Sequence, residues 1–171
     1  MKRILAFVIA MVLAAGMVLP AAADINQAQF VATRSFLMKL ESEGVDYTYE
    51  GYDAEKGCET VVVTFDDEEL NSIVFNLFFY DVKNSVRVYA WNLVNVTVPK
   101  DVALNTVNTL NYDYMFTKFY LDETDSTITC EMQGFYEIPT DAGFAGYTVM
   151  RYMYELLDDA DVAAKLLTLS K

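Results

Sequence analysis

The apolar and polar positions of this chain predict a helix, then four strands. Apolar residues recur at helical spacing between residues 24 and 43, and Gly44 follows where such a helix would end. The strand-like stretches begin at Tyr47 and continue over residues 58–65, 73–80 and 86–93. The stretch 73–80 is apolar on both faces, which is typical of a central strand, whereas 86–93 alternates and predicts one buried face.

The next stretch predicts a strand end, a helix and a new strand. Pro99 cannot donate to a sheet, but its fixed φ suits the first turn of a helix. Apolar residues then share one helical face: Ala103, Leu104, Val107 and Leu110. After Asn111 the spacing becomes that of a strand, with apolar residues on one side at Met115, Phe119 and Leu121.

A hairpin and a final helix complete the predicted fold. In the second arm of the hairpin, residues 127–136, one face carries Ile128, Cys130 and Met132. The last helix begins near Pro139, is interrupted by acidic residues 158–161 and resumes over 162–169. Its predicted buried stripe is Phe144, Tyr147, Met150, Tyr154 and Leu157. The order α-β-β-β-β-α-β-β-α predicts an α+β fold, a single antiparallel sheet with helices packed on one face.

The first 23 residues have the organisation of an export signal. Lys2 and Arg3 precede an apolar run, and small residues end it at Ala23. We expect cleavage between Ala23 and Asp24, which leaves a single domain over residues 24–171 that is secreted or held in the cell envelope. The alternative is an uncleaved membrane anchor, because residues 4–23 match the roughly 20 apolar residues that a bilayer-spanning helix needs.

The charge of the chain excludes two classes of partner. The net charge is −13, and removal of Lys2 and Arg3 makes the remaining chain more acidic. Such a surface repels phosphate backbones and anionic lipid headgroups. We therefore expect no nucleic-acid partner and no membrane partner once the signal is removed.

The composition also argues against catalysis. The chain has no histidine, so it lacks the usual general base and the commonest zinc ligand. It has neither a phosphate-binding glycine loop nor a dinucleotide fingerprint, and we predict no catalytic residues, no cofactor and no metal. The acidic run 66–69 offers carboxylates for calcium, but without the glycine and ligand spacing of a calcium loop it favours a solvated hairpin turn.

Two cysteines, Cys58 and Cys130, allow a disulfide in an exported protein. Both lie in predicted strands whose alternate residues are apolar, so two separate buried thiols are the other interpretation. A disulfide requires Cα atoms within about 7 Å of each other, which the sequence does not fix.

The stretch Val98-Pro99, the helix end at Leu110-Asn111 and the strand Lys118–Asp122 resemble the YbjN family of bacterial sensory transduction regulators. The order of elements extends this resemblance over most of residues 24–169. The resemblance implies the fold of type III secretion chaperones, brings no catalytic residues, and favours a homodimer. The export signal differs from the cytoplasmic setting of the best-known members, which argues against a chaperone of injected effectors.

We therefore predict a non-catalytic module that binds a protein or peptide, or a second copy of itself. An antiparallel sheet with a partly open face and exposed edges can accept a peptide strand. The candidate partner-binding residues are Tyr89, Trp91, Asn108, Asn111, Lys118 and Tyr120. For the polar three, the other interpretation is structural: Asn111 caps the helix, Asn108 bonds a loop backbone, and Lys118 neutralises carboxylates. The alternative function is a small-ligand or calcium sensor, or a carboxylate-based hydrolase.

Overall fold

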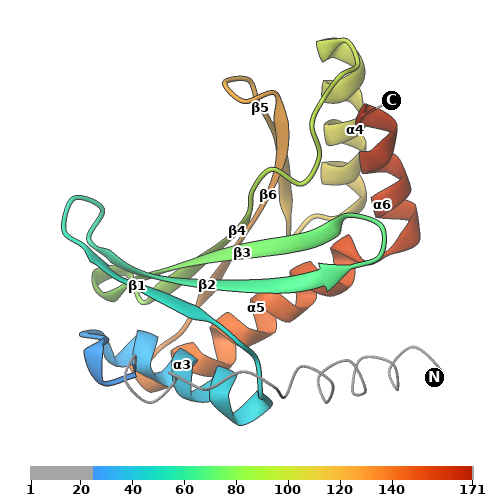
Figure 1. Cartoon of the computed structure of the whole chain (residues 1–171). Helices are drawn as coiled ribbons and strands as arrows, with labels where there is room; N and C mark the ends of the chain where they lie inside the picture. Colours follow the sequence, from blue (N-terminus) through green and yellow to red (C-terminus); the bar gives the residue numbers. More distant parts are fainter. Residues whose placement is uncertain (1–24, 171) are drawn as a thin grey trace.

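A computed structural model describes residues 25–170, which form one six-stranded antiparallel sheet with strand order β1-β2-β3-β4-β6-β5 (Figure 1). The strands are β1 (Thr48–Asp53), β2 (Cys58–Asp67), β3 (Asn71–Tyr80), β4 (Ser85–Ala90), β5 (Lys118–Asp122) and β6 (Thr127–Phe135). The predicted export signal and its cleavage position between Ala23 and Asp24 lie outside the described residues.

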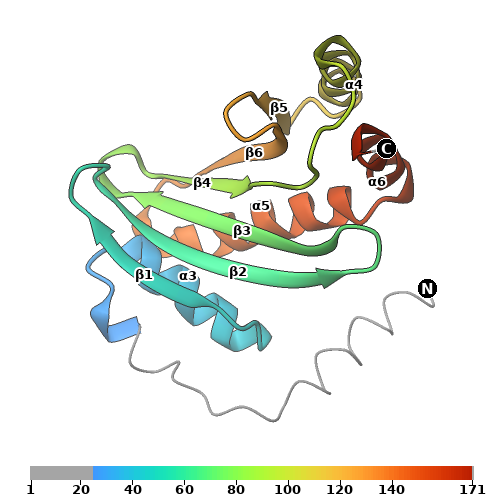
Figure 2. The same ribbon diagram turned by 45° about the horizontal axis from the view of Figure 1, so that its top comes forward.

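The helices are α3 (Val31–Glu43), α4 (Lys100–Asp113), α5 (Ala142–Leu157) and α6 (Ala160–Leu167). Short 3-10 turns cover Asp81–Lys83, Pro139–Asp141 and Thr168–Ser170. Helices α3 and α5 pack on each other and cover one face of the sheet, while α4 lies along β5 and beside α6 (Figures 1 and 2). In the described part of the chain, no helix covers the opposite face.

The predicted fold class and order of elements are confirmed, with shifts at the ends of elements. The predicted first helix is interrupted before Val31, and Gly44 ends it in the left-handed conformation at φ 67°. Strand β4 ends at Ala90, earlier than predicted, and Asn92 then takes a positive φ of 55°. Met115, predicted within a strand, precedes β5 and is 81% exposed.

The start of α3 is held by a buried carboxylate that no pattern in the sequence indicated. Glu59 of β2 is fully buried and accepts hydrogen bonds from the backbone N–H groups of Gln29 (2.6 Å) and Phe30 (3.0 Å). The Tyr49 hydroxyl donates to the same carboxylate. Phe30 is the N-cap residue and its side chain makes no cap hydrogen bond, so the carboxylate of a sheet residue holds the backbone just before the first turn of the helix.

The predicted stripe of α5 is wrong at Phe144, which is 73% exposed, although Met150 and Leu157 are buried as expected. Helix α3 lies so close that a Cβ atom on Gly143 would be 2.5 Å from the Ser35 carbonyl oxygen. Glycine therefore faces α3, and the large aromatic side chain points to solvent.

Of the two interpretations of Cys58 and Cys130, the possible disulfide is wrong, because both residues are free buried thiols. Strands β3 and β4 lie between their strands, so three strand spacings of about 4.8 Å, roughly 14 Å in total, separate them. That distance far exceeds the reach of a disulfide. Burial raises the pKa of both thiols, which keeps them protonated.

The acidic run 66–69 lies at the β2–β3 hairpin, as expected, but one of its residues is not solvated. Asp67 ends β2, is buried, and accepts hydrogen bonds through Oδ1 from the backbone N–H groups of Glu69 (3.0 Å) and Leu70 (2.7 Å). Within residues 25–170, no group of three or more carboxylate, cysteine or histidine side chains is arranged to hold a metal ion.

Candidate partner-binding surface

The face of the sheet opposite α3 and α5, here called the open face, brings several predicted residues together. The register pairs Tyr89 of β4 with Asn76 of β3 and Glu131 of β6, and pairs Glu131 with Lys118 of β5. Tyr120 of β5 shares this face because it lies two positions from Lys118. Tyr89, Lys118 and Tyr120 therefore share one surface.

An aromatic cluster forms the centre of the open face. The rings of Phe78, Tyr89 and Trp91 pack against one another with centroid distances of 5.6 to 5.7 Å. Trp91 is 43% exposed, whereas Phe78 beneath it is only 7% exposed. The sequence indicated Tyr89 and Trp91 but not Phe78, because β3 is apolar on both faces and its periodicity does not separate them.

A pocket of about 280 Å³ adjoins this aromatic cluster. Phe78 and Trp91 form part of its wall, and Glu50, Asp53 and Lys56 supply its charged groups. Asp53 accepts hydrogen bonds through Oδ1 from the backbone N–H groups of Lys56 (3.1 Å) and Glu55 (2.9 Å), and its Oδ2 lies 3.1 Å from Lys56 Nζ. These contacts, led by the hydrogen bonds from Lys56, lower the pKa of Asp53 and keep it ionised.

Cations gather at another part of the open face, around Tyr80. Lys83 Nζ lies 5.3 Å and Arg87 Cζ 5.9 Å from the centre of the Tyr80 ring. Hydrogen bonding with Tyr89 raises the pKa of Arg87, and burial raises the pKa of Tyr80. The open face of this acidic protein therefore carries both signs of charge.

The two asparagines have different surroundings. Asn111 accepts a hydrogen bond from the Phe119 N–H (2.7 Å) and donates to the Phe119 carbonyl (2.8 Å). Its amide thus binds both backbone groups of Phe119 in the edge strand β5. The prediction that Asn111 caps the helix is wrong, because its side chain binds the strand and not the end of the helix, but its role is structural. Asn108 is exposed on the same helix. Neither residue belongs to the open face, because α4 lies beside β5.

The two edges of the sheet are poorly suited to strand addition. On β5, the Asn111 amide occupies the backbone groups of Phe119. On β1, the register shifts between Tyr49 and Gly51, where Gly51 has a φ of 99°. A bulge bends and twists an edge strand and interrupts its row of donors and acceptors. The open face is therefore the better candidate surface.

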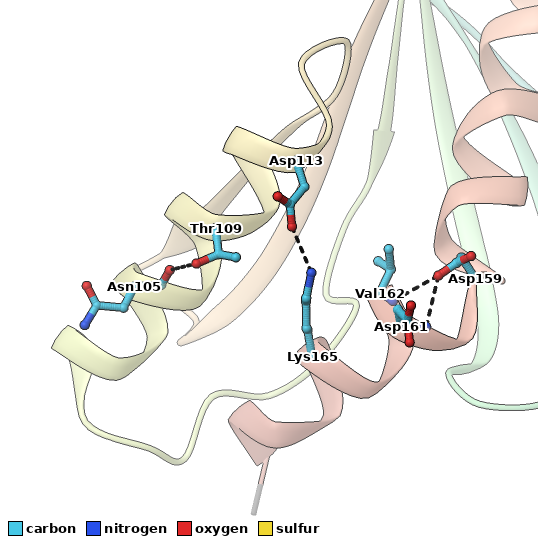
Figure 3. A network of polar contacts seen from close by, with 7 residues as sticks. All are labelled: Asn105, Thr109, Asp113, Asp159, Asp161, Val162 and Lys165. Carbon is cyan, nitrogen blue, oxygen red and sulfur yellow. Dashed lines mark hydrogen bonds and ion pairs between the residues drawn. The ribbon is translucent and has the colours of Figure 1, made fainter.

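A second group of exposed apolar residues, Tyr112, Met115 and Phe116, lies at and after the end of α4. At the same end of α4, Asp113 Oδ2 lies 2.9 Å from Lys165 Nζ of α6 (Figure 3). In α4 the Thr109 hydroxyl donates to the Asn105 carbonyl (3.0 Å). Asp159 caps α6 by accepting from the N–H groups of Asp161 and Val162. Of these contacts, the Lys165–Asp113 ion pair joins α4 to α6, and the other two each lie at a single helix. The pocket of about 200 Å³ that includes Tyr114 contains none of the three apolar residues.

No protein-family model, curated protein or solved structure matches this chain. Within residues 25–170, no helix has both the length and the apolar composition needed to cross a bilayer.

Proposed function

We propose that this protein is an exported, YbjN-like, non-catalytic binding module that holds a protein or peptide partner against its open face. The observation that carries the proposal is the aromatic cluster of Phe78, Tyr89 and Trp91, partly exposed on a face that no described helix covers. Tryptophan and tyrosine dominate the binding energy of protein interfaces, and rigidly held side chains lose little entropy on binding.

The position of these rings favours a partner that lies across the sheet. Trp91 packs on Phe78 and Tyr89, and these contacts restrict its ring before a partner arrives. Both sheet edges are interrupted, by Asn111 at β5 and by the bulge at Gly51 in β1. Side-chain contacts on the open face, rather than added main-chain hydrogen bonds, would then supply the affinity.

The test compares Trp91→Ala with a control, Phe144→Ala, which removes an exposed aromatic ring from α5 on the covered side of the sheet. The purified protein is used to capture partners from the exterior fraction of its source. We expect Phe144→Ala to capture the same proteins and Trp91→Ala to lose them. Light scattering of the same variants tests a second copy as the partner. If neither a captured partner nor a dimer depends on Trp91, the proposal is wrong.

The proposed location has its own test. N-terminal sequencing of the exported protein is expected to begin at Asp24, because the small residues ending at Ala23 suit a signal peptidase. A chain that begins at Met1 and stays with the membrane fraction would support the anchor alternative instead.

The sensor alternative is tested by thermal unfolding. A ligand that binds only the folded protein raises the unfolding midpoint. We expect no shift with calcium or with a chelator, and a calcium-dependent rise would overturn the binding-module proposal in favour of the sensor.

A further inference from the structure

We propose that the pocket beside Trp91 receives a single cationic side chain, lysine or arginine, from the partner. This inference rests on the proposed function and specifies the chemistry of the same surface.

The size of the pocket suits one side chain. Its volume is about 280 Å³, just below the roughly 300–1,000 Å³ range of sites that enclose whole small molecules. Phe78 and Trp91 line it, and aromatic rings attract ammonium and guanidinium groups within about 6 Å of the ring centre. An aliphatic stem with a charged end fits both features.

The charged groups of the pocket favour a cation. Glu50 and Asp53 contribute two carboxylates against the single ammonium of Lys56, so the pocket is net negative in a chain whose net charge is already −13. Among the ion pairs of residues 25–170, none involves Glu50. An anionic ligand would meet repulsion from both carboxylates.

Lys56 shows that an ammonium is held here. Its Nζ lies 3.1 Å from Asp53 Oδ2, and its side chain is 63% exposed, so it can turn towards solvent without losing buried contacts. An incoming ammonium would take its place beside Asp53 and also approach Glu50. Lys56 is therefore a competitor for the cation, and its removal should strengthen binding.

The experiment titrates the full chain with blocked single amino acids and follows the fluorescence of Trp91, the only tryptophan in the chain. The probes are Nα-acetyl-lysine methylamide, its arginine equivalent and its norleucine equivalent, which keeps an apolar stem but has no charge. We expect the cationic probes to bind at millimolar concentrations, roughly fivefold more tightly than norleucine, as a partly exposed cation–aromatic contact allows.

Three variants that keep Trp91 test whether the charges of the pocket set its affinity for a cation. Lys56→Met is expected to tighten lysine binding about threefold and Glu50→Gln to weaken it by a similar factor, with both effects smaller at high salt. Glu41→Gln, on exposed α3 surface, is the control and should change nothing. Thermal unfolding of each variant checks that it folds.

Equal binding of norleucine and lysine, or weaker lysine binding in Lys56→Met, would overturn the inference. A partner that depends on Trp91 while no cationic probe binds would leave the proposed function standing and remove only the cationic pocket. If no partner depends on Trp91 and no cationic probe binds, both proposals are wrong.

Discussion

The contact between Asn111 and β5 leads to a specific prediction about stability. Replacement of Asn111 by alanine removes one hydrogen bond from the Phe119 N–H (2.7 Å) and one to the Phe119 carbonyl (2.8 Å). Strand β5 is an edge strand, so in the described chain no further strand can supply these bonds. The substitution therefore leaves a donor and an acceptor unpaired beside α4.

The expected cost follows from the two bonds. An intramolecular hydrogen bond contributes about 1 kcal/mol net, so the loss of both part-buried bonds should lower the free energy of unfolding by roughly 2 kcal/mol. Alanine also favours a helix over asparagine, by up to about 0.7 kcal/mol. Asn108→Ala is the matched control, because Asn108 is exposed on the same helix and gains the same helical preference. The difference between the two variants isolates the contact with β5.

Urea and thermal unfolding of both variants measure this difference. For a domain of this size, 1 kcal/mol corresponds to a midpoint shift of about 2–4 °C, so Asn111→Ala should melt roughly 4–8 °C below Asn108→Ala. Because the edge of β5 is then uncovered, light scattering should also detect more self-association of Asn111→Ala. If the two variants unfold within about 0.5 kcal/mol of each other, the Asn111 amide does not stabilise the edge strand.

Three further predictions concern the core. Glu59→Gln should lower the free energy of unfolding by about 2 kcal/mol, because an amide N–H2 replaces a buried carboxylate oxygen that accepts backbone hydrogen bonds; an unchanged urea midpoint would contradict this role. Gly143→Ala should cost about 1–3 kcal/mol, since its Cβ would lie 2.5 Å from the Ser35 carbonyl oxygen; normal thermal stability would show that α3 and α5 separate easily. Cys58 and Cys130 should resist alkylation at about pH 8 in the folded, unreduced protein and both react after unfolding. Fewer than two reactive thiols in denaturant would contradict free cysteines. The raised pKa values of these thiols favour their protonated forms in the folded state, so the free energy of unfolding should fall as the pH rises above about 8.5.

The sequence by itself determined the succession of helices and strands. Alternation and helical spacing are local properties of the chain. Gly44 ends helix α3 and Pro99 precedes helix α4, and each acts only on the adjacent turn of its helix. The alternation in β6 likewise predicted that Cys130 lies on the buried side of its strand, where it is fully buried.

Only the tertiary structure decided which of these surfaces meet. The spacing predicted that Phe144 faces the core, but Gly143 is the residue that faces α3, because α3 and α5 approach too closely for a side chain there. The order of the sheet places two strands between those of Cys58 and Cys130. Glu59 binds backbone groups that lie 29 and 30 residues away in the sequence, and Asn111 binds backbone groups 8 residues away. Spacing along the chain fixes the face on which a side chain lies, but the distance between elements fixes its partner, and that distance depends on how the whole sheet twists and packs.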